Sequence, residues 1–271
     1  MGVLPVFCVR GPAQRVATLP NQPSNSAPTL SIDFAWVLLL GLLAGTVGGV
    51  IGFGSSIMLM PALVLMFGPR EAVPVMAVAS IVANASRVAI WWRDIDWPCA
   101  LAFSATAAPA AALGAATLLR LPPGVIEGVL GLFFIAMVPL RRWMARQSWR
   151  LSLWHMALFG AVVGFITGVV VTTGPINAPL FLAFGLVKGA FLATEALGSL
   201  AMFVAKAATF DLLGALPMAS VGQGLIIGST LMVGSWWAKR CVLKLEAAQF
   251  RGLIEGLLVL AGLTMLWAAL N

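Results

Sequence analysis

The sequence predicts an all-α integral membrane protein with about eight transmembrane helices. Of its 271 residues, 61% are hydrophobic and only 9% are charged, whereas a soluble domain carries about 25% charged residues. The hydrophobic residues form runs long enough to cross the ~30 Å hydrocarbon core as helices. A barrel would instead show strands that alternate with a period of two residues, and the sequence has no such pattern.

Residues 1–33 differ in composition from the rest of the chain. The stretch from Arg10 to Thr29 is rich in Pro, Ser, Asn and Gln and has no acidic residue. It contains no apolar segment long enough to act as a cleavable signal peptide. We therefore expect a disordered N-terminal tail that is retained in the protein.

Apolar runs between polar breaks define the eight expected spans. They are 34–53, 72–92, 98–119, 124–140, 154–173, 189–210, 218–237 and 249–270. Shorter apolar pieces, 56–67 and 176–186, follow the first and fifth spans. A single helix over 34–67 would be about 50 Å long, too long for one crossing at 1.5 Å per residue. We therefore expect the first span to break near Gly54 and the fifth near Gly174.

The two halves of the chain repeat one another. Residues of the same or similar type recur 119 positions apart: Gly45 and Gly164, Gly49 and Gly168, Ser80 and Ser199, Arg87 and Lys206, Pro98 and Pro217. This spacing predicts a first transmembrane repeat over 34–143 and a second over 154–271, each with four spans. Because four is an even number, the two repeats should be parallel and related by an axis along the membrane normal.

The glycine-rich segments of both halves resemble those of the TauE/SafE sulfite exporter family. The first runs from Gly45 to Gly54 and is followed by Pro61, and its counterpart runs from Gly160 to Gly174, followed by Pro179. The Asp96-Trp97 pair is also typical of the family, and the resemblance covers about residues 36–270. It implies export or uptake of small sulfur-containing or organic anions, such as sulfite or sulfonates.

The two expected helix breaks are candidate substrate-binding segments. A half-helix that begins inside the membrane exposes unpaired N–H groups and its positive dipole end, both of which favour an anion. The candidates at the two breaks are Gly54, Ser55, Ser56, Thr173, Gly174 and Asn177. The alternative is that these glycines only allow close helix packing.

Arg87 and Lys206 are candidate substrate-binding cations, since both lie inside apolar spans at matching places in the two halves. A cation in hydrocarbon is costly and normally faces a cavity or a partner. Two symmetric cations would suit an anion site. The alternative is that their long side chains reach the membrane surface.

Glu195 is the only acidic residue in the body of an expected span. An isolated ionised carboxylate is strongly disfavoured in an apolar interior, so we expect Glu195 to couple transport to protons. Its alternative role is that of a buried partner. Lys206 shares its helix face but lies about 16 Å away along the axis, too far for direct pairing.

The sequence therefore predicts a secondary transporter of small sulfur-containing or organic anions, with an uncoupled anion channel or facilitator as the alternative. With one His, three Cys and no C-x-x-C pair, we expect no metal, no cofactor and no enzyme activity. The net charge of +7 fits basic loops rather than nucleic-acid binding. We expect a multi-pass protein of a bacterial inner membrane, with both termini in the cytoplasm because four Arg crowd the central loop.

Overall fold

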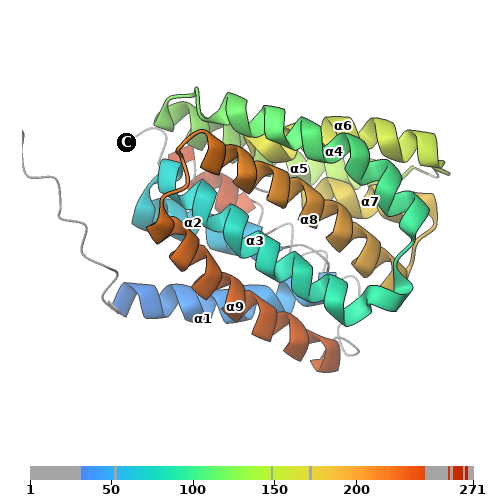
Figure 1. The fold of residues 1–271 in the computed structure, drawn as a ribbon, viewed down its shortest axis with the longest axis horizontal. Helices are drawn as coiled ribbons and strands as arrows, with labels where there is room; N and C mark the ends of the chain where they lie inside the picture. The colour runs from blue at the N-terminus through green and yellow to red at the C-terminus, as the bar shows by residue number, and fades with distance from the viewer. Residues whose placement is uncertain are drawn as a thin grey trace, which may run out of the picture.

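The computed structural model of the protein describes residues 32–51, 54–147, 149–170, 173–241, 256, 259–264 and 266–267. Within these residues all regular elements are helical, which confirms the all-α prediction (Figure 1). The helices are α1 (Ile32–Ile51), α2 (Ser55–Phe67), α3 (Pro69–Trp91), η1 (Trp92–Asp94), α4 (Trp97–Leu118), α5 (Pro123–Ala145), α6 (Leu153–Val169), α7 (Gly174–Phe184), α8 (Lys188–Leu212) and α9 (Met218–Cys241). Nearly all of the expected tail and most of the eighth expected span lie outside the described residues.

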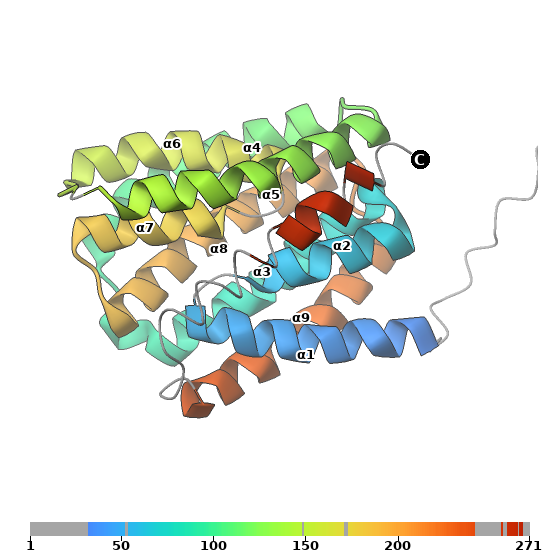
Figure 2. The ribbon, with the colours of Figure 1, turned by 180° about the vertical axis from the view of Figure 1, so that it is seen from behind.

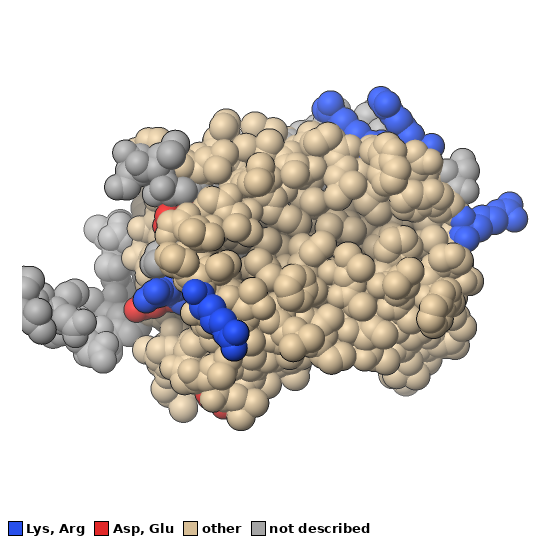
Figure 3. Space-filling view, turned by 90° about the horizontal axis from the view of Figure 1, so that it is seen from above, with Lys and Arg blue, Asp and Glu red and all other residues tan. Residues whose placement is uncertain are grey.

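Five of the described helices are long and apolar enough to cross a membrane. They cover residues 70–94, 97–118, 124–144, 189–212 and 218–238, and each coincides with one of the expected spans. Helices α1, α2, α6 and α7 contain shorter apolar stretches. On the face seen in Figure 3, charged side chains lie at the two ends of the bundle and leave an uncharged band between them. The molecule is therefore a multi-pass membrane protein.

The two expected helix breaks are present. Helix α1 ends at Ile51 and α2 begins at Ser55, while α6 ends at Val169 and α7 begins at Gly174. Gly54, which precedes α2, has a φ of 115°, a backbone conformation that glycine adopts without steric cost. The glycine-rich sequence at this point therefore allows the chain to change direction between two helices.

Glycines set close contacts between helices that run in the same direction. Gly160, Gly164 and Gly168 of α6 face Phe103, Ala107 and Ala111 of α4 in the same order. These contacts fix α4 and α6 as parallel, and a Cβ on Gly160 would lie only 2.5 Å from the Phe103 carbonyl oxygen. Small residues spaced four apart allow membrane helices to approach at backbone distance.

Helices α1, α3 and α9 are also parallel to one another. Gly45 of α1 meets Leu231 of α9 and Gly49 meets Ser235, while Gly224 and Gly228 of α9 meet Val78 and Val82 of α3. Because α1 and α3 run in the same direction, α2 must carry the chain back between them. Figure 2 shows α2 turning back from the far end of α1.

The prediction that the two halves are parallel is wrong. Helices α3 and α8 are related by the 119-residue spacing, yet the end of α3 meets the beginning of α8 through an ion pair of Arg87 with Glu195. At the opposite end, Val73 of α3 and Phe210 of α8 line one pocket. These two helices are therefore antiparallel, and the halves are inverted. The sequence-based prediction treated α1 and α2 as one continuous crossing, whereas α2 reverses the direction of the chain between α1 and α3.

Helix packing follows the same inverted relation. Helix α1 packs on α9 as α6 packs on α4, and α3 packs on α9 as α8 packs on α4. Helices α3 and α8, which pack on each other, lie at the centre of this arrangement. Most of the helix packing is therefore between the halves, through the pairs α4–α6, α1–α9, α3–α9, α4–α8 and α3–α8.

We predict that Gly164→Ala destabilises the protein and that Gly128→Ala does not. A Cβ on Gly164 would lie 2.7 Å from the Cα of Ala107, whereas a Cβ on Gly128 of α5 meets nothing within 4 Å. Overpacking a close contact costs about 1–3 kcal/mol, while alanine is a better helix former than glycine. Thermal unfolding of both variants in detergent measures this difference. Equal melting temperatures for the two variants would contradict the close α4–α6 packing.

Candidate functional site

A small polar cavity lies at the interface between the two halves. Helices α2, α3, α6, α7 and α8, with the residue before α7, contribute its lining: Ser55, Ser56, Ser80, Ala83, Asn84, Arg87, Thr167, Thr173, Gly174, Glu195, Ser199, Met202 and Phe203. The cavity volume is about 20 Å³, which holds about one water molecule. A larger solute therefore needs a movement of the lining helices or side chains.

The beginnings of α2 and α7 both face this cavity. Ser55 opens α2 and Gly174 opens α7, and neither helix has a side-chain cap at its N-terminus. The Thr173 hydroxyl, which stands where a cap would be, is hydrogen-bonded to the Thr167 hydroxyl. The first amides of a helix lack acceptors within the helix, and the helix dipole makes this end partly positive. At α7 the Ile176 and Asn177 amides donate to the Thr173 carbonyl, so this helix contributes its dipole. The partly positive ends of α2 and α7 converge on the cavity.

A buried ion pair joins the two halves in the cavity wall. Nη1 of Arg87 lies 3.1 Å from Oε2 of Glu195, and the two residues are 8% and 1% exposed. The second guanidinium nitrogen of Arg87 donates to the side-chain oxygen of Asn84. The other carboxylate oxygen of Glu195 accepts from the Ser199 hydroxyl at 2.7 Å and from the Asn177 amide at 3.3 Å. The pair is therefore held by hydrogen bonds from α3, α7 and α8.

Two polar atoms beside the ion pair lack a partner. Among the described residues, the Ser80 hydroxyl and the Asn177 side-chain oxygen are buried without any hydrogen bond. Ser80 lines the cavity, and its hydroxyl is free to donate to an acceptor there. A buried polar group without a partner costs free energy, so an acceptor in the cavity would gain this hydrogen bond.

Lys206 lies outside the lining of the cavity. Its ammonium group donates to the carbonyl oxygens of Thr167 and Val170, each at 2.9 Å, at the end of α6. It also lies 5.6 Å from the centre of the Phe210 ring. The side chain is completely buried, so it does not reach the membrane surface. A cation at the carbonyl end of a helix is favourable, and Lys206 holds α6 where that helix breaks.

The structure thus brings most of the sequence-predicted residues together. Ser55, Ser56, Thr173, Gly174, Arg87 and Glu195 line the cavity, Asn177 contacts Glu195, and Gly54 immediately precedes α2. The expectation that Glu195 is isolated is wrong, because Arg87 is its partner. Arg87 also does not reach the membrane surface, since it is buried in this pair.

Sequence reasoning missed Ser80, Asn84 and Ser199 as site residues. The first and last had a visible signal, because they are matched serines of the repeat, 119 residues apart. Asn84 had none, because the equivalent position in the second half is Phe203. All three line the cavity.

Discontinuous helices that begin at a buried polar site are typical of many secondary membrane transporters. The family described as Sulfite exporter TauE/SafE matches this chain over residues 37–265. The chain therefore belongs to this family, as the glycine-rich segments predict. No curated protein and no solved structure matched the chain.

We predict that removing one member of the Arg87–Glu195 pair costs more stability than removing both. Glu195→Ala leaves a buried guanidinium without its counter-ion, which costs about 3–5 kcal/mol. The double variant Arg87→Met, Glu195→Ala removes the unpaired charge and should recover part of this loss. Thermal unfolding of the two single variants and the double variant gives the coupling between them. If the loss of stability in the double variant equals the sum of the losses in the two single variants, the two side chains do not interact.

Proposed function

We propose that the protein is a secondary transporter of small sulfur-containing or organic anions, with the substrate bound in the polar cavity between the halves. The observation that carries this proposal is the meeting of a buried guanidinium, Arg87, with the beginnings of α2 and α7. All three are positive groups that face one polar cavity inside the bundle. Membership of the sulfite exporter family supports an anion as substrate.

The anion competes with Glu195 for Arg87. Glu195 holds one guanidinium nitrogen at 3.1 Å, and a sulfur oxyanion offers negatively charged oxygens that accept the same charge-assisted hydrogen bonds. The hydroxyls of Ser55, Ser56 and Ser80, which line the same cavity, supply further donors. Because the cavity of about 20 Å³ is too small for sulfite, binding separates the ion pair and moves the helices that carry it.

Proton coupling follows from this competition. When an anion takes Glu195's place beside Arg87, the carboxylate is left in a buried site without a cation, where its ionised form is strongly disfavoured. Glu195 therefore takes up a proton as substrate binds and releases it when Arg87 returns. The alternative function is an uncoupled anion channel or facilitator, in which Glu195 only holds Arg87 in position.

The inverted fold changes the expected orientation in the membrane. Arg93, Arg142, Arg146 and Arg150 follow or end α3 and α5 and lie at one end of the bundle, whereas α1 begins at the opposite end, which it shares with Arg70 and Arg120. The positive-inside rule places the Arg-rich end in the cytoplasm. We therefore propose that α1 begins on the outer side, which reverses the orientation inferred from sequence.

We predict that Arg87→Gln lowers sulfite transport about tenfold or more, since a hydrogen bond to a charged group contributes about 1.5–3 kcal/mol. Flux of radiolabelled sulfite in proteoliposomes measures the effect. The variant Arg87→Gln, Glu195→Gln avoids an unpaired buried charge and should be folded but inactive. Arg93→Gln, a change at an exposed position, is the control. Normal flux in the folded double variant would exclude Arg87 as the substrate-binding cation.

We predict that Glu195→Gln abolishes the response of transport to an imposed pH gradient. Glutamine keeps the shape of the side chain and an acceptor oxygen for Arg87, but it does not titrate. Because Arg87 then lacks its counter-ion, flux is compared per folded protein, with thermal unfolding measured alongside. Exchange of sulfite at equal concentrations on both sides should continue, because no net proton movement is needed. Sulfite flux with and without a pH gradient distinguishes a proton-coupled transporter from an uncoupled facilitator. A wild-type protein that ignores the gradient would favour the facilitator.

A further inference from the structure

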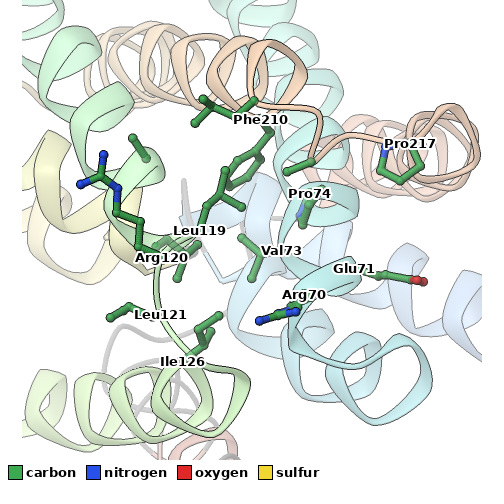
Figure 4. Close-up of a pocket in the computed structure, with 14 residues that line it drawn as sticks. Arg70, Glu71, Val73, Pro74, Leu119, Arg120, Leu121, Ile126, Phe210 and Pro217 are labelled. Atoms are coloured by element: carbon green, nitrogen blue, oxygen red, sulfur yellow. The ribbon is translucent and has the colours of Figure 1, made fainter.

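A second, larger cavity opens at the end of the bundle where α3 begins. It has a volume of about 570 Å³ and lies between the start of α3, the α4–α5 turn and the α8–α9 turn. Its wall includes the apolar side chains of Val73, Leu121, Ile126 and Phe210 (Figure 4). Ligand sites typically have volumes of about 300–1,000 Å³, so this cavity can admit a small organic solute.

The side chain of one cationic residue, Arg70, points into this cavity. In Figure 4 the Arg70 guanidinium is directed toward the space beside Val73 and Ile126, whereas the side chains of Arg120 and Glu71 point away from it. A positive group above apolar walls matches an anion that carries a small apolar group, such as an alkanesulfonate. Cavities lined by one sign of charge also concentrate ions of the opposite sign.

Two residues, Phe210 and Lys206, connect the inner wall of this cavity with the central polar cavity. Phe210 is completely buried and lines the cavity, and the Lys206 ammonium lies 5.6 Å from the centre of its ring. Lys206 in turn donates to the Thr167 carbonyl, and Thr167 lines the central polar cavity. Phe210 and Lys206 therefore stand between the two cavities.

The opposite end of the bundle is packed at the equivalent place. Trp91 lies 119 residues before Phe210, at the end of α3. A Cβ on Gly189 of α8 would lie 2.9 Å from a ring carbon of Trp91 and 2.6 Å from a carboxylate oxygen of Asp94. The Asp96 amide further ties this end to Thr194 of α8 at 3.0 Å. Among the described residues the two ends therefore differ: a cavity opens beside Phe210, whereas Trp91 and Asp94 are packed against Gly189.

We infer that the 570 Å³ cavity is the access vestibule for an organic anion. Arg70 attracts the anion, and Phe210 closes the passage to the central site. This inference rests on the proposed anion transport and adds its route through the bundle. Inverted repeats exchange their conformations when access alternates, so Trp91 and Phe210 are the two barriers of the cycle.

Thiol labelling tests the role of Arg70. Leu121→Cys, in a full-length chain whose three natural cysteines are replaced by alanine, is treated with anionic sulfonatoethyl and cationic trimethylammonioethyl methanethiosulfonate. The anion-to-cation rate ratio should be about tenfold higher than at Met218→Cys, because fields of this kind raise encounter rates by about 10–10³. Met218 is exposed at the same end and is not part of the cavity lining.

Two further measurements test whether Arg70 and an anion site in the cavity cause this selectivity. Arg70→Gln should lower the rate ratio at Leu121→Cys to that at Met218→Cys, and ethanesulfonate should slow labelling at Leu121→Cys alone. Equal anion-to-cation rate ratios at Leu121→Cys and Met218→Cys would contradict the assignment of this cavity as an access vestibule. A ratio at Leu121→Cys that Arg70→Gln leaves unchanged would contradict it as well. These measurements need no transport, so they fail or succeed independently of the sulfite flux that tests the proposed function.

A deeper cysteine tests Phe210. Thr167→Cys in the central cavity should react slowly with the anionic reagent, and Phe210→Ala should raise its rate about tenfold or more. Phe134→Ala is the matched control, since Phe134 of α5 is also completely buried but is not part of the cavity lining. No acceleration with Phe210→Ala, or equal acceleration with Phe134→Ala, would show that Phe210 does not close the passage.

Discussion

The ion pair between Arg87 and Glu195 is the interaction on which the site depends. Each charge alone would be costly in an apolar interior, and together they are tolerated because Asn84, Asn177 and Ser199 complete their hydrogen bonds. The pair connects α3 of one half with α8 of the other. Any solute that replaces one partner therefore changes the contact between the halves, which links binding to movement.

The packing of the inverted halves determines which helices can move when this ion pair separates. Helices α4 and α6, like α1 and α9, are held at backbone distance by glycines, so they form firmly packed pairs. The short helices α2 and α7 begin at the cavity instead of spanning the bundle. Polar backbone at membrane depth is tolerated only where it is buried in protein or faces a cavity. The helix breaks are thus stable because they surround the polar site.

The sequence specifies the local features well and the long-range ones poorly. Apolar run length and glycine positions predict the helices and both breaks, because these depend on neighbouring residues. The reversal at α2 was not predictable in this way, since a short apolar run looks the same whether the chain continues or turns back. The partner of Glu195 was also missed, because Arg87 is 108 residues away and Met76, the repeat equivalent of Glu195, carries no charge.

Proton uptake on anion binding tests the central claim most directly. The purified protein in weakly buffered detergent solution is titrated with ethanesulfonate, a probe that does not itself titrate near neutral pH, while the pH is recorded. Displacement of Glu195 from Arg87 predicts the uptake of about one proton per bound anion, and none in Glu195→Gln. Anion binding to the wild-type protein without proton uptake, or equal uptake by the variant, would contradict the account.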